Sequence, residues 1–259
     1  MTNIDTQQNL LRLLRSTDEK TVAVGLTIHE ATPTPASTAL LDTYQELYQS
    51  FFNTKIHQLT TQHLMVLNAT SLDLSNQQLK CLPKAIGCLD NLQVLLLYNN
   101  HLTQLPLEMG QLINLQQLSL EHNQLTQLPK EITQLSYLDG ISLGHNQFKQ
   151  FPKEITTLSN LSILNLNNND ITQLPEEIQQ LTQLEGLSLE GNQLEQLPKE
   201  IGQLNHLQIL LLAENQLTYL PEETQQITNL QFLSLRGNPI HQSQQASIQA
   251  WFPKCDIEW

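Results

Sequence analysis

Few residues of the chain combine types and spacing that could do chemistry. His122 and His145 lie 23 residues apart, and Glu121 precedes the first histidine. Two imidazoles and a carboxylate could in principle hold a metal ion, which would suggest a metal-dependent enzyme. The alternative is a pair of exposed, half-polar turn residues. We favour the turn residues, because nothing else of an active site accompanies the histidines.

The motifs of the common enzyme classes are not found in the sequence. It contains no HExxH, no Walker loop and no dinucleotide-binding glycine fingerprint. No nucleophile stands with an assignable base. Cys81, Cys88 and Cys255 are odd in number and form no CxxC pair, so they predict neither a zinc site nor a disulfide framework. We therefore expect no catalytic residue, no cofactor and no metal, and we expect a protein that is not an enzyme.

The interval of 23 residues between the histidines recurs through most of the chain. The unit at residues 115–137, LQQLSLEHNQLTQLPKEITQLSY, is repeated before and after itself. Its proline falls at Pro83, Pro106, Pro129, Pro152, Pro175, Pro198 and Pro221. Self-similarity at a fixed period of this length is typical of a solenoid, in which each repeat stacks on the next as one rung.

Each repeat predicts a short strand, a turn and a short helical segment. Leu118 and Leu120 are two residues apart, as in a strand with one buried side. Pro129, Ile132 and Leu135 are three apart, which is helical or 3₁₀ spacing, and proline suits a first helical position. One such unit cannot bury enough apolar surface to fold alone, so neighbouring units must stack.

An asparagine follows each predicted strand, where the backbone turns inward. It recurs as Asn100, Asn123, Asn146, Asn169, Asn192, Asn215 and Asn238. Buried backbone groups at such a turn need hydrogen-bond partners. A side-chain amide offers two donors and an acceptor, so we expect it to bond the turns of its own and the next rung. A catalytic role for this column is not expected.

These motifs resemble the leucine-rich repeat family, in its 23-residue LPxxIxxL class, over about residues 69–241. The class is found in intracellular plant proteins, animal Ras-group proteins and many bacterial repeat proteins. The resemblance implies an α/β fold, a right-handed solenoid shaped as a horseshoe. Parallel strands would line its concave face, and helical or 3₁₀ segments its convex face. Members of the family typically bind proteins through the concave face.

The repeats divide the chain into three parts. Residues 64–241 are predicted to form a solenoid of eight rungs, the first of them degenerate at Ala69 and Gln77. Residues 1–63 are expected to form a helical N-terminal cap. Residues 242–259 are expected to form a C-terminal cap, with a helix over 243–252 and a short edge strand.

The first part is expected to be helical because its apolar residues fall on helical spacing. The leucines of residues 10–14 share one helix face, and Ser16 with Glu19 suggests a capping box for a second helix near 18–30. A third amphipathic pattern runs over residues 40–52. We expect these helices to cover the open edge of the first rung. The alternative is that one of them docks on another protein.

Strand residues that point away from the core are free to bind a partner. On this face apolar residues gather at two places, with small polar residues between them. The two clusters are Val94, Leu96 and Tyr98, and Ile209, Leu211 and Phe232. Exposed apolar clusters indicate an interface, so we predict that a protein or peptide is bound at both clusters, one at each end of the face. We expect the serine and glycine floor to leave room for it. The alternative is that the N-terminal helices fold over the first cluster.

The predicted binding surface includes polar residues of the same face. Its residues are Val94, Leu96, Tyr98, Glu121, His122, His145, Ile163, Asn165, Asn167, Glu190, Ile209, Leu211, Phe232 and Arg236. On a stacked sheet, His122 and His145 are expected about 5 Å apart. The sequence does not identify the partner.

The composition limits the kind of partner. The formal net charge is −13, and no basic stripe is present, which argues against nucleic acid and anionic membranes. An acidic balance favours a basic partner. No run is long enough to span a membrane and no signal peptide is evident, so a cytoplasmic monomer is expected. We predict a non-enzymatic interaction module or signalling scaffold. The alternative is a bacterial effector or surface-acting protein exported without an N-terminal signal.

Overall fold

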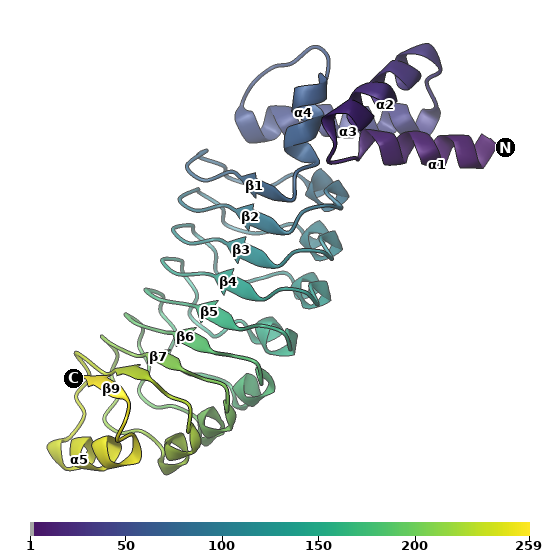
Figure 1. The fold of residues 1–259 in the computed structure, drawn as a ribbon. Helices are drawn as coiled ribbons and strands as arrows, with labels where there is room; N and C mark the ends of the chain where they lie inside the picture. Colours follow the sequence, from purple (N-terminus) through teal and green to yellow (C-terminus); the bar gives the residue numbers. More distant parts are fainter. Residues whose placement is uncertain (1–2) are drawn as a thin grey trace.

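The computed structural model describes residues 3–259, with side chains from residue 5 onward. Nine strands form one open parallel sheet in which each strand pairs with the next along the chain (Figure 1). The strands are β1 Ser71–Asp73, β2 Val94–Leu96, β3 Gln117–Ser119, β4 Gly140–Ser142, β5 Ile163–Asn165, β6 Gly186–Ser188, β7 Ile209–Leu211, β8 Phe232–Ser234 and β9 Asp256–Glu258. From β1 to β8 the pairing advances by one repeat, for example from Ser71 to Val94, so equivalent residues form columns across the sheet.

From β1 to β8, a five-residue 3₁₀-helix returns the chain from each strand to the next. These helices are η1 Lys84–Cys88, η2 Leu107–Gln111, η3 Lys130–Gln134, η4 Lys153–Thr157, η5 Glu176–Gln180, η6 Lys199–Gln203 and η7 Glu222–Gln226. The prolines precede the helices instead of opening them. Pro83 is extended at ψ 147°, and its carbonyl accepts the first helical hydrogen bond from Ile86 N–H. The predicted first-helical position for proline is therefore wrong by one residue.

The strands lie on the concave side of the curved stack and the 3₁₀-helices on its convex side (Figure 1). Between them the repeated leucines and isoleucines form one continuous buried core. The predicted horseshoe solenoid is confirmed. The 3₁₀-helices pack on the convex side of the sheet. The other face of the sheet is therefore left open.

The asparagine column holds successive rungs together from inside the turns. In Asn123, the amide oxygen accepts the N–H of Leu102, and the amide nitrogen donates to the carbonyls of Leu97 and Leu120. Leu120 lies in the same rung, whereas Leu97 and Leu102 lie in the preceding one. The prediction of a bond to the next rung is therefore wrong, because the unpaired backbone groups belong to the turn that the chain has just left.

Glycines on the convex side allow close stacking of some 3₁₀-helices. A Cβ on Gly110 would lie 2.4 Å from the carbonyl oxygen of Glu131, and one on Gly202 would lie 2.2 Å from that of Glu223. These contacts are to backbone of the following rung, which cannot swing aside. The glycines are thus part of the stacking geometry.

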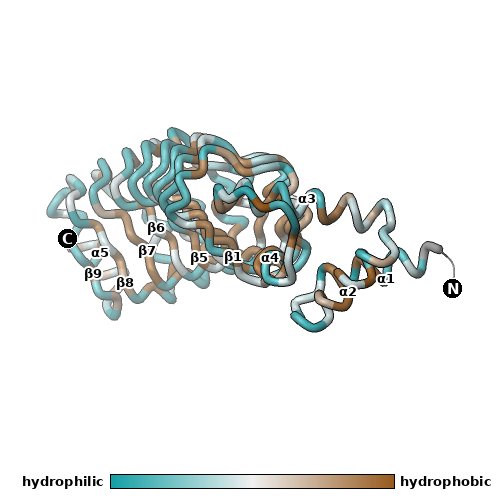
Figure 2. The backbone as a smooth tube through the Cα atoms, turned by 90° about the horizontal axis from the view of Figure 1, so that it is seen from above, coloured by the Kyte–Doolittle hydropathy of each residue, from teal (hydrophilic) through white to brown (hydrophobic). Residues whose placement is uncertain are grey.

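Four helices precede the sheet: α1 Asn3–Leu14, α2 Glu19–Ala31, α3 Pro35–Phe52 and α4 Thr61–Leu67. They lie beyond β1 at the end of the stack, and the apolar parts of α1 and α2 lie side by side (Figures 1 and 2). The predicted capping box of Ser16 and Glu19 is wrong. Asp18 caps α2 by accepting the N–H of Thr21, because Asp18 stands directly before Glu19, the first helical residue, and Ser16 lies two positions further away.

Hydrogen bonds join these helices to one another, and an ion pair joins them to the first rung. The Tyr44 hydroxyl donates to the amide oxygen of Asn68, whose amide nitrogen donates to the carbonyl of Leu14. The Arg15 guanidinium lies 2.6 Å from the Asp90 carboxylate. Burial raises the pKa of Tyr44, so this buried hydroxyl keeps its proton as a donor.

At the other end, α5 Gln242–Trp251 and β9 close the stack. Strand β9 pairs in parallel with β8, which confirms the predicted edge strand. Cys255 is buried as predicted, and burial raises the pKa of its thiol to about 11. None of the helices in residues 3–259 is long and apolar enough to cross a membrane.

Candidate protein-binding face

The open side of the sheet, which we call the inner face, is built from five positions in each rung. These are the residue before the strand, its first and third residues, and the second and third residues after it. The middle residue of each strand points into the core. In β2, for example, Leu95 is buried, whereas Val94 and Leu96 on either side of it are half-buried.

Val94, Leu96 and Tyr98 form the first apolar cluster on this face. Tyr98 is 38% exposed, and its ring meets that of His122 edge-on at 5.0 Å. The four N-terminal helices lie at the end of the stack, and they leave Tyr98 exposed. The structure therefore contradicts the alternative in which those helices fold over this cluster.

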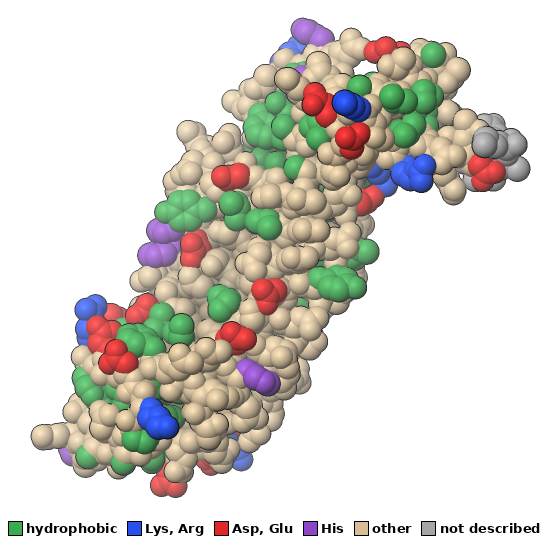
Figure 3. Space-filling view, viewed as in Figure 1, with side chains coloured by type: hydrophobic (Ala, Val, Ile, Leu, Met, Phe, Trp, Pro, Cys, Tyr) green, Lys and Arg blue, Asp and Glu red, His purple; other side chains and the backbone are tan. Residues whose placement is uncertain are grey.

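Ile209, Leu211 and Phe232 form the second apolar cluster, on β7 and β8. Ile209 is 44% exposed, whereas Leu211 and Phe232 are half-buried. Ile163 on β5 is 48% exposed and lies between the two clusters. In the space-filling view, apolar side chains gather towards both ends of the visible sheet face (Figure 3). Each cluster thus has one exposed and two half-buried members, and the two clusters are separated along the stack.

The glycine floor between the clusters is not empty. A Cβ on Gly140 would meet the side-chain oxygen of Gln117, and one on Gly186 would meet the end of Ile163. The long side chains of neighbouring rungs therefore lie over both glycines. The expectation that glycine leaves room on the floor is wrong at these two positions, because a neighbour fills the space.

Amides hold two carboxylates in place across the middle of the inner face. The Asn165 amide donates to Glu121 at 2.5 Å, although the two residues are two rungs apart. Gly144 lies on the rung between them and has no side chain to block this contact. On the next rungs the Asn167 amide nitrogen donates to the Glu190 carboxylate at 3.5 Å, and the Asn167 amide oxygen accepts the backbone N–H of Glu190 at 2.8 Å. Sequence periodicity did not reveal the contact of Asn165 with Glu121, because these two residues stand in different columns.

The two histidines stack instead of converging on one point. Their ring centroids are 3.9 Å apart at 11°, and Asn168 contacts the Nε2 atom of His145 at 3.2 Å. The lone pairs of an imidazole lie in the ring plane, so parallel stacked rings do not aim both at one ion. Among the described residues, no group of three or more His, Cys, Asp or Glu is placed to hold a metal.

Both histidines stand in a turn column with a left-handed backbone. His122 has φ 54° and His145 has φ 52°, and Asn168 and Gly191 continue the column. Asparagine and glycine tolerate this conformation best, so their recurrence in the sequence was a usable signal for it. Burial lowers the pKa of His145, helped by neighbouring His122 and opposed by Glu121. His145 is therefore neutral near pH 7.

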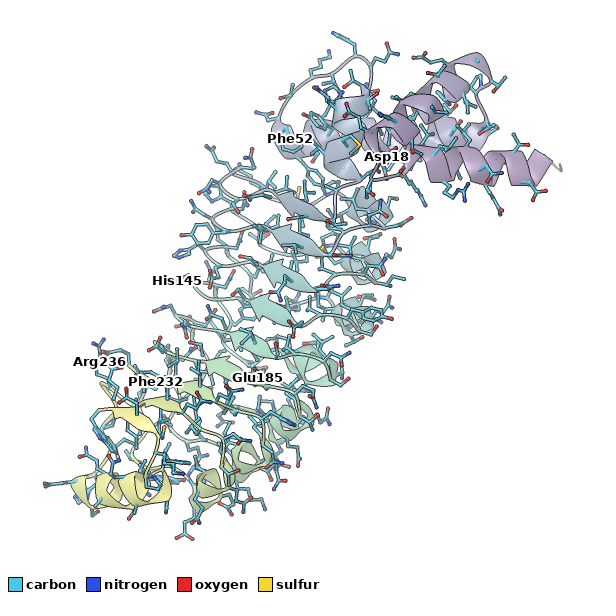
Figure 4. The ribbon with its side chains drawn as sticks, in the orientation of Figure 1. Asp18, Phe52, His145, Glu185, Phe232 and Arg236 are labelled. Atoms are coloured by element: carbon cyan, nitrogen blue, oxygen red, sulfur yellow. The ribbon has the colours of Figure 1, made fainter. Side chains whose placement is uncertain are left out.

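Carboxylates dominate the charge of the inner face. They are Asp73, Glu121, Asp139, Glu185, Glu190 and Glu214. Arg236 is the one arginine or lysine among the described residues of this face, and its Nη2 lies 3.7 Å from the Glu214 carboxylate. Glu185 lies where the strands begin, and Arg236 and His145 where they lead into turns (Figure 4). The face therefore carries a net negative charge along both edges.

The structure also exposes an apolar pair that sequence reasoning missed. Tyr137 is 63% exposed, and Ile113 one rung earlier is 56% exposed. In four other rungs the position of Tyr137 holds an asparagine, and Asn114 and Asn160 each donate to a backbone carbonyl 24 residues earlier at 2.7 Å. The break in this second asparagine column was the signal available in the sequence.

Comparisons with known proteins agree with this architecture. A model of a leucine-rich repeat region matches residues 107–190, and a leucine rich repeat model matches residues 183–240. No curated protein matches the chain.

Several solved structures are similar to this chain over 70–75% of its length. The leucine-rich repeat ectodomain of the Arabidopsis thaliana membrane receptor kinase GASSHO1/SCHENGEN3, in complex with CASPARIAN STRIP INTEGRITY FACTOR 2, is 35% identical, with a TM-score of 0.61, over 70% of this chain and 23% of that one. A Leptospira interrogans LRR protein is 39% identical, with a TM-score of 0.45, over 73% and 60%. A Listeria monocytogenes internalin is 20% identical, with a TM-score of 0.57, over 75% and 62%. The chain spans less than two thirds of each of these.

Proposed function

The chain belongs to the leucine-rich repeat proteins, and we propose that it is a non-enzymatic interaction module that holds a protein or peptide on its inner face. One observation carries the proposal. Tyr98 and Ile209 are large apolar side chains exposed on a face whose other exposed residues, apart from Ile163, are polar or glycine. Folding does not require them there, and exposed apolar clusters of this kind mark binding surfaces. The resemblance to a receptor ectodomain solved with a bound factor supports the same role.

In this proposal the parts outside the repeats act as end caps. A solenoid leaves apolar core open at both ends, and it needs terminal segments with a polar outer side. Residues 1–63 supply helices that pack on the first rung, through contacts such as Arg15 to Asp90. Residues 242–259 supply α5 and β9 at the last rung. Neither cap crosses the inner face, so the eight rungs between them form the binding surface.

A matched pair of double variants tests the proposal. The inner-face variant combines Tyr98→Ser with Ile209→Ser. The control combines Tyr219→Ser with Ile113→Ser, which removes the same residue types at 43% and 56% exposure from outside the inner face. Each variant and the wild-type chain are used as bait in extract of the native cell, and captured proteins are identified by mass spectrometry.

We expect wild type and control to capture the same protein, and the inner-face variant to lose it. Unfolding midpoints in urea establish that both variants are folded. If the inner-face variant retains the captured protein, or the control loses it equally, the proposal is wrong.

A further inference from the structure

The inner face carries its charge in two rows that flank a shared floor. One row follows the strands and holds Glu121, Glu190 and Glu214; the other precedes them and holds Asp139 and Glu185. Opposite rows of like charge repel each other, and nothing in the stacking of the core requires them. A ligand that brings positive charge between the rows relieves this repulsion.

Neighbouring polar groups fix the carboxylates in place. Glu121 accepts the Asn165 amide, and Asp139 accepts the Gln117 amide at 3.2 Å and the Ser162 hydroxyl at 2.5 Å. Such bonds hold an acceptor in one orientation before a ligand arrives, and a preorganised site loses less entropy on binding. The acidic rows are thus built features of the face.

The inner-face cation is placed at one end. Arg236 lies on the last rung beside Glu214, so it neutralises one carboxylate at the edge of the face and leaves the middle rungs without a positive group. Glu121, Asp139, Glu185 and Glu190 all lie on rungs three to six, between the two apolar clusters. The sequence of surfaces along the stack is therefore apolar, acidic with the exposed Ile163 in its middle, and apolar again.

Resting on the function proposed above, we propose that the partner segment is an extended peptide with a run of lysines and arginines between two apolar residues. In an extended chain successive side chains point to opposite sides, so a run of basic residues meets both acidic rows. The apolar residue at each end contacts one apolar cluster.

The spacing of the apolar residues follows from the sheet. From β2 to β7 there are five strand steps, and at about 4.8 Å per step they span roughly 24 Å. An extended peptide advances about 3.3 Å per residue, so its two apolar residues stand about seven positions apart. The six residues between them lie over the acidic rungs.

Synthetic peptides test this directly with the full chain. The first has phenylalanine at positions 1 and 8 and alternating lysine and arginine between them. The second replaces the six basic residues with glutamine, and the third with glutamate. The fourth keeps the basic composition but places both phenylalanines together at one end. Each carries the same fluorophore, and binding is followed by anisotropy at low and high salt.

We expect the first peptide to bind at least tenfold tighter than the glutamine peptide, and tighter than the peptide with adjacent phenylalanines. We expect no binding of the glutamate peptide. Added salt weakens the first peptide most, because screening acts on the charged contacts.

Two variants with equal charge change locate the binding site. The triple variant Glu121→Gln, Glu185→Gln and Glu190→Gln removes three inner-face carboxylates. The control variant Glu131→Gln, Glu154→Gln and Glu200→Gln removes three from the convex side. We expect at least a fivefold loss of affinity for the first peptide in the inner-face variant and little change in the control.

The possible failures separate this inference from the function on which it rests. If the glutamine peptide binds as tightly as the basic one, or if both triple variants bind the basic peptide equally, the proposal that the partner segment is basic is wrong. If no peptide binds while Tyr98→Ser with Ile209→Ser still abolishes capture of a cellular protein, the inference fails and the proposed function stands. If that capture persists as well, both fail.

Discussion

The residue types on the two sides of each strand are constrained differently. On the core side, the middle residue of every repeat strand is leucine or isoleucine, and each is buried. On the inner face one residue away, the column runs Ser71, Val94, Gln117, Gly140, Ile163, Gly186, Ile209 and Phe232. Stacking fixes the first column because each rung must fit the next. The second column varies because stacking leaves it free.

This contrast indicates which residues of a repeat protein are available for binding. Residues that recur with the period build the scaffold. Residues that depart from the period on an exposed face indicate a requirement other than folding, such as binding. Tyr98 and Ile209 are such departures, and so is the edge pair of Ile113 and Tyr137. Substitutions on the two sides should therefore separate stability from binding.

The largest effect is expected inside the turns, at Asn146. Its amide accepts the N–H of Leu125 and donates to the carbonyls of Leu120, Leu143 and Gly144. Asn146→Ala leaves these backbone groups without partners, at about 1–3 kcal/mol each when buried. We expect the free energy of unfolding in urea to fall by about 4 kcal/mol or more. The exposed neighbour supplies the control, since Gln147→Ala should change it little; equal effects would refute the role of the column.

Adjacent residues on opposite sides of β7 allow a core-side substitution to be compared with an inner-face substitution in one strand. Leu210 is fully buried and Ile209 is 44% exposed. Leu210→Ala should lower the free energy of unfolding by about 2–5 kcal/mol, through lost burial and a cavity. Ile209→Ala should lower it by less than about 1 kcal/mol, as is usual at exposed positions. Similar losses at both positions, measured by urea denaturation, would mean that Ile209 serves the fold.

Substitution of one glycine on each side compares how tightly the convex side and the inner face are packed. A Cβ at Gly202 would run into backbone of the next rung, so Gly202→Ala should lower the free energy of unfolding by about 1–3 kcal/mol. At Gly140 the atom in the way is the flexible end of Gln117, which can move. Thermal unfolding should show the smaller shift for Gly140→Ala. The opposite order would contradict the stacking account.

The smallest effect concerns pH at the histidine stack. The pKa of His145 is lowered in the folded chain, so below its ordinary value of about 6.5 the unfolded chain binds more protons. Stability should therefore rise with pH up to that value and be lost as pH falls below it. His145→Asn should reduce this dependence, and the urea midpoints at pH 5 and pH 7.5 compare the two chains. An unchanged dependence would place its cause elsewhere.

Much of the fold was predictable because it repeats. Proline and asparagine at every 23rd residue predict the rungs, and the alternation of Leu118 with Ser119 predicts which side is buried. The failures were local. Asp18, not Ser16, caps α2, and Asn123 bonds the preceding turn, because such details depend on the exact path of the chain.

The inner face was predictable only as a set of columns. The sequence predicts that Tyr98 and Ile209 point outward, and the structure exposes them. It does not predict that Asn165 reaches Glu121 across two rungs, or that Gln117 covers Gly140. The first contact joins different columns, and both depend on the lengths and rotamers of individual side chains, which no periodic pattern encodes.

The most direct test of the inner face as the binding surface is site-specific photo-crosslinking in the native cell. The photoreactive residue p-benzoylphenylalanine replaces either Ile209 or Tyr219, which are 44% and 43% exposed and lie on different faces. We expect a covalent adduct with one partner protein from position 209 and none from position 219. An adduct from position 219 alone, or equal adducts from both, would contradict the account.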